Sequence, residues 1–77
     1  MSQQLLLRFD NFDKAAFDDD AENRANAGLS VLQLWQEGST AHWALLQVND
    51  KGKAQGWIDK NSSLGHGPSG HHFLTTL

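Results

Sequence analysis

A chain of 77 residues is long enough for one domain, spanning residues 1–77, and its lack of cysteine excludes disulfide support and thiol chemistry. Its net charge of −3 and its six dispersed Lys and Arg residues argue against nucleic acid as a partner. The N-terminus lacks the charge and the long apolar run of a secretion signal, so we expect a soluble, cytoplasmic protein that does not associate with membranes.

The first third of the chain predicts a strand followed by helix. Residues 4–9 form a compact apolar run that ends at two polar residues, which is typical of a strand. Residues 12–27 predict one broken helix or two short ones, with Asp10 or Asn11 as the first cap. Gly28 is well placed to end this helical region, since glycine readily adopts the left-handed conformation found there.

Two strands are expected over residues 29–37 and 41–49, joined by a hairpin turn at 38–40. Both are rich in Val, Leu and Trp, yet neither alternates cleanly between apolar and polar residues. The first strand divides its apolar side chains between two faces, with Leu29, Val31 and Trp35 on one and Leu32 and Leu34 on the other. This pair of strands is therefore apolar on both faces, unlike an antiparallel sheet with one face in water.

The segment 51–60 is compatible with a helix or a strand. A cap at Asn49 or Asp50 and the spacing of Ala54, Trp57 and Ile58 favour a helix. Two glycines oppose it, since each weakens a helix by about 1 kcal/mol relative to alanine. Residues 61–70 then predict a loop, and residues 72–77 predict a final strand.

The resulting order of strand, helix, strand, strand, helix and strand is that of the ferredoxin-like βαββαβ folds. This α+β fold class implies an antiparallel four-stranded sheet with two helical segments on one face. The alternative is a small SH3-like β-barrel, because the strand, turn and Gly56-Trp57-Ile58 rhythm resembles bacterial SH3-like domains. The acidic, alanine-rich region 12–27 does not fit that all-β alternative.

The second face of such a sheet has no segment of the chain to cover it. That face would carry several of Leu6, Leu32, Leu34, Trp43 and Leu45. Burial of a large apolar side chain contributes about 1.5–3 kcal/mol, so exposing such a row would lose much of a small domain's stability. We therefore expect a homodimer whose sheets pack together, an arrangement that is similar to the dimeric α+β barrels.

A histidine-rich loop provides the first candidate site. His66, His71 and His72 lie within residues 65–72, among glycines and one proline. Imidazole binds Zn, Cu or Ni, so these three residues are weak candidates for metal ligands. If His71 and His72 begin a strand, however, their side chains point to opposite faces and do not easily reach one ion. The spacing matches no strong metal signature, and the sequence requires no cofactor.

Tryptophan and histidine provide the second candidate site. Trp35, Trp43 and Trp57 could line a ligand pocket, with His42 beside Trp43. The candidate ligand-binding residues are His42, Trp43, His66, His71 and His72. We expect a small homodimeric binding module with a protein or small-molecule partner. The alternative is a cofactor-independent or metal-assisted enzyme that uses His and Trp in a barrel pocket.

Overall fold

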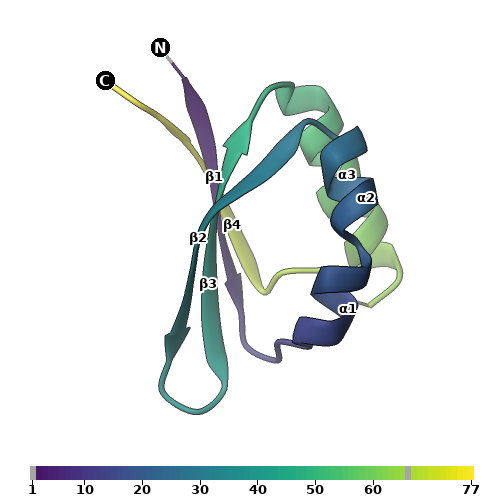
Figure 1. The fold of residues 1–77 in the computed structure, drawn as a ribbon, viewed down its shortest axis with the longest axis vertical. Helices are drawn as coiled ribbons and strands as arrows, with labels where there is room; N and C mark the ends of the chain where they lie inside the picture. The colour runs from purple at the N-terminus through teal and green to yellow at the C-terminus, as the bar shows by residue number, and fades with distance from the viewer. Residues whose placement is uncertain (1, 66) are drawn as a thin grey trace.

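The computed structural model describes residues 2–65 and 67–77, which form one antiparallel sheet with helices on one side (Figure 1). The elements in chain order are β1 (Gln3–Phe9), α1 (Lys14–Asp19), α2 (Ala21–Asn26), β2 (Leu29–Glu37), β3 (Ala41–Val48), α3 (Lys51–Ser63) and β4 (Gly70–Thr75). The prediction of two short helices over 12–27 is confirmed, and the open question at 51–60 is settled as helix.

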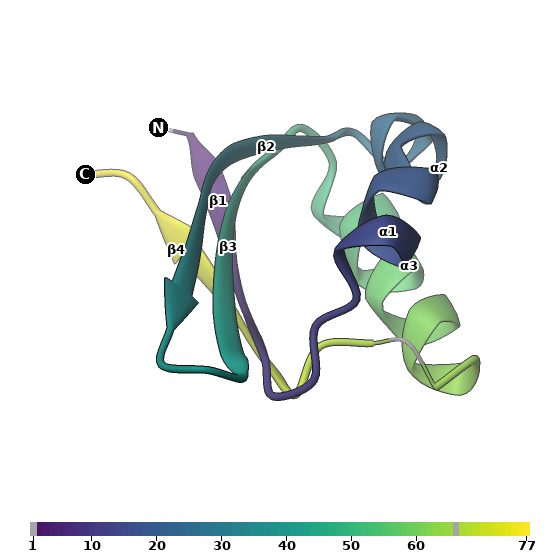
Figure 2. The same ribbon diagram turned by 60° about the horizontal axis from the view of Figure 1, so that its bottom comes forward.

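The four strands of the described chain lie in the order β2-β3-β1-β4, and every neighbouring pair is antiparallel. In the centre, Leu5 lies opposite Leu46 of β3 and Phe73 of β4. Figure 2 shows all three helices on the same side of this sheet, so its other face is uncovered by the described residues. The sheet is open, and the alternative of a small SH3-like barrel does not describe it.

Side-chain carboxylates cap two of the helices. The Asp13 carboxylate accepts a hydrogen bond from the Ala16 backbone N–H at 3.1 Å, so Asp13, rather than Asp10 or Asn11, is the cap of α1. Asp50 caps α3 in the same way by accepting from the Lys53 N–H, also at 3.1 Å. Gly28 has a φ of 73° and follows the end of α2, as predicted.

The core lies between the helices and one face of the sheet. Leu5, Leu7 and Leu46 are fully buried there, because alternate residues of β1 and β3 point toward the helices. From α3, Ala54, Trp57 and Ile58 complete the core, with the helical spacing noted in the sequence.

An irregularity in β2 corrects the predicted faces of this strand. The register shifts between Val31 and Gln33, so the chain inserts one extra residue relative to β3. As a result Leu34 packs against the core, whereas Trp35 lies opposite Trp43 on the uncovered face. Strict alternation predicts Trp35 on the same face as Val31 and Leu34 on the opposite face. The observed arrangement is the reverse, because a bulge reverses the side-chain alternation that follows it.

Candidate functional site

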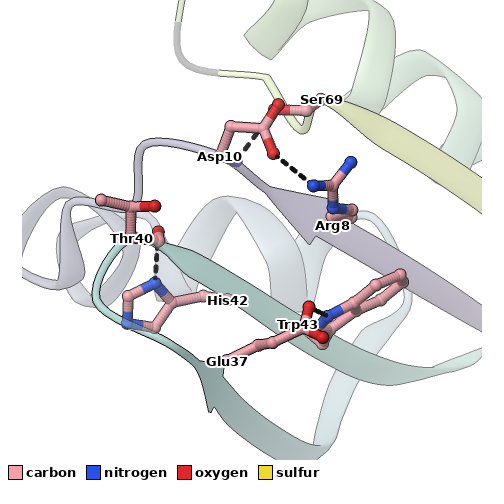
Figure 3. Close-up of polar contacts among 7 residues, drawn as sticks. All are labelled: Arg8, Asp10, Glu37, Thr40, His42, Trp43 and Ser69. Carbon is pink, nitrogen blue, oxygen red and sulfur yellow. Dashed lines mark hydrogen bonds and ion pairs between the residues drawn. The ribbon is translucent and has the colours of Figure 1, made fainter.

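His42 and Trp43 project from opposite faces of β3. His42 faces the helix side, where its ring stacks on Phe12 with centroids 4.7 Å apart. Its Nδ1 lies 3.0 Å from the Thr40 carbonyl oxygen, which accepts a hydrogen bond from the Nδ1–H tautomer (Figure 3). Trp43 faces the other way, and its Nε1–H donates to Glu37 Oε1 at 2.9 Å. These neighbouring residues therefore cannot line one pocket together.

The candidate metal ligands His71 and His72 also point apart. In the register with β1, His71 lies opposite the buried Leu7, whereas His72 lies opposite Leu6 of the uncovered face. The third candidate, His66, lies outside the described residues. Within residues 2–65 and 67–77, no three His, Asp or Glu side chains are grouped to hold a metal ion.

Two regions of the molecule are candidate binding sites. The first is the sheet face that the helices do not cover, which we call the outer face. Five apolar side chains run diagonally across its four strands, from Trp35 through Trp43, Leu45 and Leu6 to Leu74. We call them the outer band. Trp35 and Leu74 on the two edge strands are each 43% exposed, and the other three are half-buried. An exposed apolar patch of this kind marks an interaction surface more often than a free one.

Polar groups flank the outer band at both ends. At one end Gln4 donates to Gln47 Oε1 at 3.2 Å and accepts from the Thr76 hydroxyl at 2.6 Å. At the other end, the Arg8 guanidinium pairs with Asp10 at 3.0 Å and lies 5.9 Å from the ring centre of Trp43 (Figure 3). An apolar centre with a polar rim is the usual anatomy of a protein interface.

The second region is a cavity of about 250 Å³ on the helix side of the sheet. Its aromatic walls come from the end of β1, the following loop, α1 and α3, through Phe9, Phe12, Phe17 and Trp57. The three phenylalanine rings pack with centroids 5.1 to 6.2 Å apart. We call this cavity the aromatic pocket. His42, which stacks on Phe12, borders an adjoining hollow between the loop at 10–13 and the start of β3, and this hollow shares Asn11, Phe12 and Asp13 with the aromatic pocket.

Two carboxylates and two amides also line the aromatic pocket, from Asp13, Asp20, Asn11 and Asn61. Asp20 joins the helices, because its Oδ2 accepts from the Trp57 Nε1–H at 2.8 Å while its Oδ1 accepts from Asn23 at 2.7 Å. Apolar walls with a few fixed polar groups are the usual composition of a small-ligand site.

A buried arginine lies against the same helices. Arg24 is only 6% exposed, its guanidinium lies 3.8 Å from the ring centre of Phe17, and it donates to the Phe17 carbonyl oxygen. Burial lowers the pKa of Arg24, while the negative charges of Asp20 and Asp18 act in the opposite direction. Aromatic and acidic groups thus already accommodate one cation in this layer.

Glycines shape the mouth of the aromatic pocket. Gly65 has a φ of 78°, a conformation that few other residues adopt easily. Gly67 lies so close to α3 that a Cβ added there would come within 2.8 Å of the Ser62 Cα. The glycines of this loop therefore serve chain turning and close packing.

The aromatic pocket could not be recognised from the sequence, apart from Trp57 as a ligand-pocket candidate. Its phenylalanines belong to the core or pack against it, and Asp13 caps α1, so each of these residues also has an ordinary local role. Their convergence depends on how α1 and α3 meet over the end of β1. The one available signal was the density of aspartate and phenylalanine within residues 9–20.

Along the described chain, no helix is both long and apolar enough to cross a bilayer. Comparison with known proteins adds no assignment. No family model, no curated protein and no solved structure matches this chain, so its candidate sites are defined by their own geometry.

Proposed function

We propose that this chain is a small homodimeric binding module, in which two copies pair through their outer faces. The proposal includes a ferredoxin-like βαββαβ fold whose two sheets stack as in a dimeric α+β barrel. The observation that supports it is the outer band, an apolar diagonal on a sheet face that no described segment covers.

The size of the outer face suits a second copy of the chain. Four strands about 4.8 Å apart, each six to nine residues long, form a face of roughly 19 by 25 Å. Two such faces would together bury about 1,000 Å², which is near the lower limit for a specific interface. A homodimer needs no other surface, since a two-fold pair uses the same patch on both copies.

The composition of the outer face also suits self-association. Its rim carries both signs of charge, with Arg8 and Glu37 near the same end of the sheet, so pairing does not bring together two faces of one sign. Trp35 and Trp43 lie opposite each other in the outer band, and tryptophan is a residue type enriched at interface centres.

The mass of the chain in solution tests this proposal. Sedimentation equilibrium of the wild type should give twice the 8.5 kDa of one chain at micromolar to millimolar concentration. Leu45→Glu and Trp35→Glu each place a charge in the outer band and should give monomers with an unchanged circular dichroism spectrum. Leu64→Glu is the matched control, because Leu64 is 62% exposed on the helix side and its change should leave the dimer intact.

A wild-type chain that stays monomeric over this range would contradict the proposal, as would folded dimers of both outer-band variants. The alternative of an enzyme acting through His and Trp in one pocket gains no support from the geometry, because His42 and Trp43 project from opposite faces of β3.

A further inference from the structure

We propose that the aromatic pocket binds a small organic cation, namely an ammonium group carried on an alkyl chain. The pocket is lined by core residues and helices on the side of the sheet away from the outer band. This inference therefore goes beyond the homodimer, and it holds whether or not two copies pair.

The walls of the pocket match an alkylammonium group. Four aromatic side chains from separate parts of the chain face one cavity, and the negative face of an aromatic ring attracts a cation. Phe12 and Phe17 are half-buried, so part of each ring borders the cavity rather than the closed core. Rings arranged around a cavity are a known means of holding quaternary ammonium groups.

The charge around the pocket selects a cation over an anion. Residues 8–24, which include the Arg8 that pairs with Asp10 and the buried Arg24, contain six carboxylates against two arginines and one lysine, a net charge of −3. That lysine, Lys14, is already paired with Asp18 at 2.8 Å. Asp13 and Asp20 line the cavity itself, where low-dielectric walls strengthen their field. A phosphate or carboxylate ligand would be repelled here.

The protein's own Arg24 uses the same combination of groups. Its guanidinium lies over the Phe17 ring and near Asp20, and it stays buried in that setting. The cavity offers a second cation comparable partners, since Asp13, Asp20 and the half-buried Phe12 line it. Because a carboxylate has about four acceptor positions, the bonds that Asp20 already makes leave capacity for a ligand.

The volume limits the ligand to one small group. About 250 Å³ is less than the roughly 300–1,000 Å³ of sites for drug-sized molecules. Such a group could come from a free amine or from a lysine side chain of another protein, and both present the same ammonium chemistry.

The Trp57 Nε1–H resonance provides a local reporter, because this group donates to Asp20 at the edge of the pocket. Its signal is assigned by its loss in Trp57→Phe. We expect choline to shift it saturably in the full 77-residue chain. The neutral isostere 3,3-dimethyl-1-butanol should bind at least about fivefold more weakly, because it has the same shape without the charge. A peptide containing trimethyl-lysine tests the second source of the ammonium group.

Charge-neutralising variants locate the site. Asp20→Asn and Asp13→Asn should each weaken choline binding about fivefold. Asp19→Asn is the matched control, because it removes the same charge from an exposed residue that does not line the cavity, and it should weaken choline binding less than about twofold. Asp13→Asn is independent of the buried Arg24 and keeps a good cap residue on α1, so it remains informative if Asp20→Asn fails to fold.

Each outcome of these titrations either supports or contradicts the proposal. Saturable binding of choline, of the trimethyl-lysine peptide or of both supports the proposal and identifies the source of the ammonium group. Equal binding of the neutral isostere overturns it, as does an Asp19→Asn effect equal to that of Asp13→Asn, or the absence of any saturable shift with both cations. The same titration in the Leu45→Glu variant distinguishes failure of the pocket from failure of the dimer, since that variant changes only the outer face.

Discussion

The two faces of this sheet carry similar side chains but face different surroundings. Leu7 and Leu46 point toward the helices and are fully buried, whereas their chain neighbours Leu6 and Leu45 point to the outer face and are only half-buried. The residues are chemically the same and lie one position apart. What separates them is the layer of helices on one side only.

The polar groups near the two faces differ in the same way. On the helix side, Trp57 donates to Asp20 and Arg24 lies against Phe17, both largely removed from water. On the outer face, the hydrogen bond of Trp43 to Glu37 and the pair of Arg8 with Asp10 are exposed. The comparison shows that the helix side contains the buried contacts that stabilise the fold, whereas the outer face leaves apolar surface exposed, which under our proposal a second copy covers.

The largest difference is expected between Leu46→Ala and Leu45→Ala. Leu46→Ala should lower the free energy of unfolding by about 3 kcal/mol, because it leaves a cavity in a fully buried position. Leu45→Ala should lower that of the monomer by less than about 1 kcal/mol, because its side chain is already partly in water. Urea denaturation at several protein concentrations measures both.

The dependence of stability on protein concentration further distinguishes Leu45→Ala from Leu46→Ala. Since Leu45 belongs to the outer band, its loss should also reduce the dependence of the urea midpoint on protein concentration. Equal losses of stability from the two substitutions at low concentration would show that the outer face is as important to the monomer as the core.

The next effect compares the two arginines. Arg24→Ala should lower the free energy of unfolding by about 2–3 kcal/mol, because it removes a buried side chain and a charged donor to the Phe17 carbonyl. Arg8→Ala should cost less than about 1 kcal/mol, since the side chains of Arg8 and Asp10 are 46% and 55% exposed. Thermal unfolding followed by circular dichroism gives both values. A larger loss of stability from Arg8→Ala than from Arg24→Ala would contradict the burial of Arg24 on the helix side.

A smaller contrast is expected for two tryptophans. Trp57→Phe should cost about 1–2 kcal/mol, because Asp20 loses a partner at a largely buried position. Trp43→Phe should cost only a few tenths of a kcal/mol in the monomer, since water replaces the exposed bond to Glu37. Chemical denaturation of the two variants at low protein concentration tests this order.

The smallest effect is a gain in stability. Gly56 lies in α3 with open space around the position of a Cβ, so Gly56→Ala should raise the free energy of unfolding by about 0.5–1 kcal/mol. Gly28→Ala is the opposing control, because its φ of 73° is unfavourable for alanine and the Asn49 Cβ lies 3.3 Å from the added atom. If two copies pair as proposed, an unchanged dimer dissociation constant in Gly56→Ala would show that the helical layer can be strengthened without affecting the outer face.

Much of the local structure could be predicted from the sequence. Both strands of the hairpin, the two short helices and the glycine that ends α2 follow from propensity, turn residues and spacing. Residues 51–60 were ambiguous because Gly52 and Gly56 oppose a helix that packs Ala54, Trp57 and Ile58 into the core. Core burial of that face outweighs the intrinsic preference of the two glycines.

The candidate sites were less predictable. The separation of His71 from His72 follows from strand alternation and was expected, but the placement of Trp35 was not, because the bulge after Val31 leaves no clear signature in the chain. The aromatic pocket depends on four segments that meet only in the folded molecule.

By itself the sequence determined the identity and approximate limits of most elements, with residues 51–60 as the exception, because these depend on interactions between residues close in the chain. It also determined that apolar side chains would exceed what one face of the sheet can bury. Only the tertiary structure decided which of them lie under the helices and where the aromatic and acidic groups converge. The physical reason is that burial and electrostatic fields depend on distances between remote segments, which are set by packing.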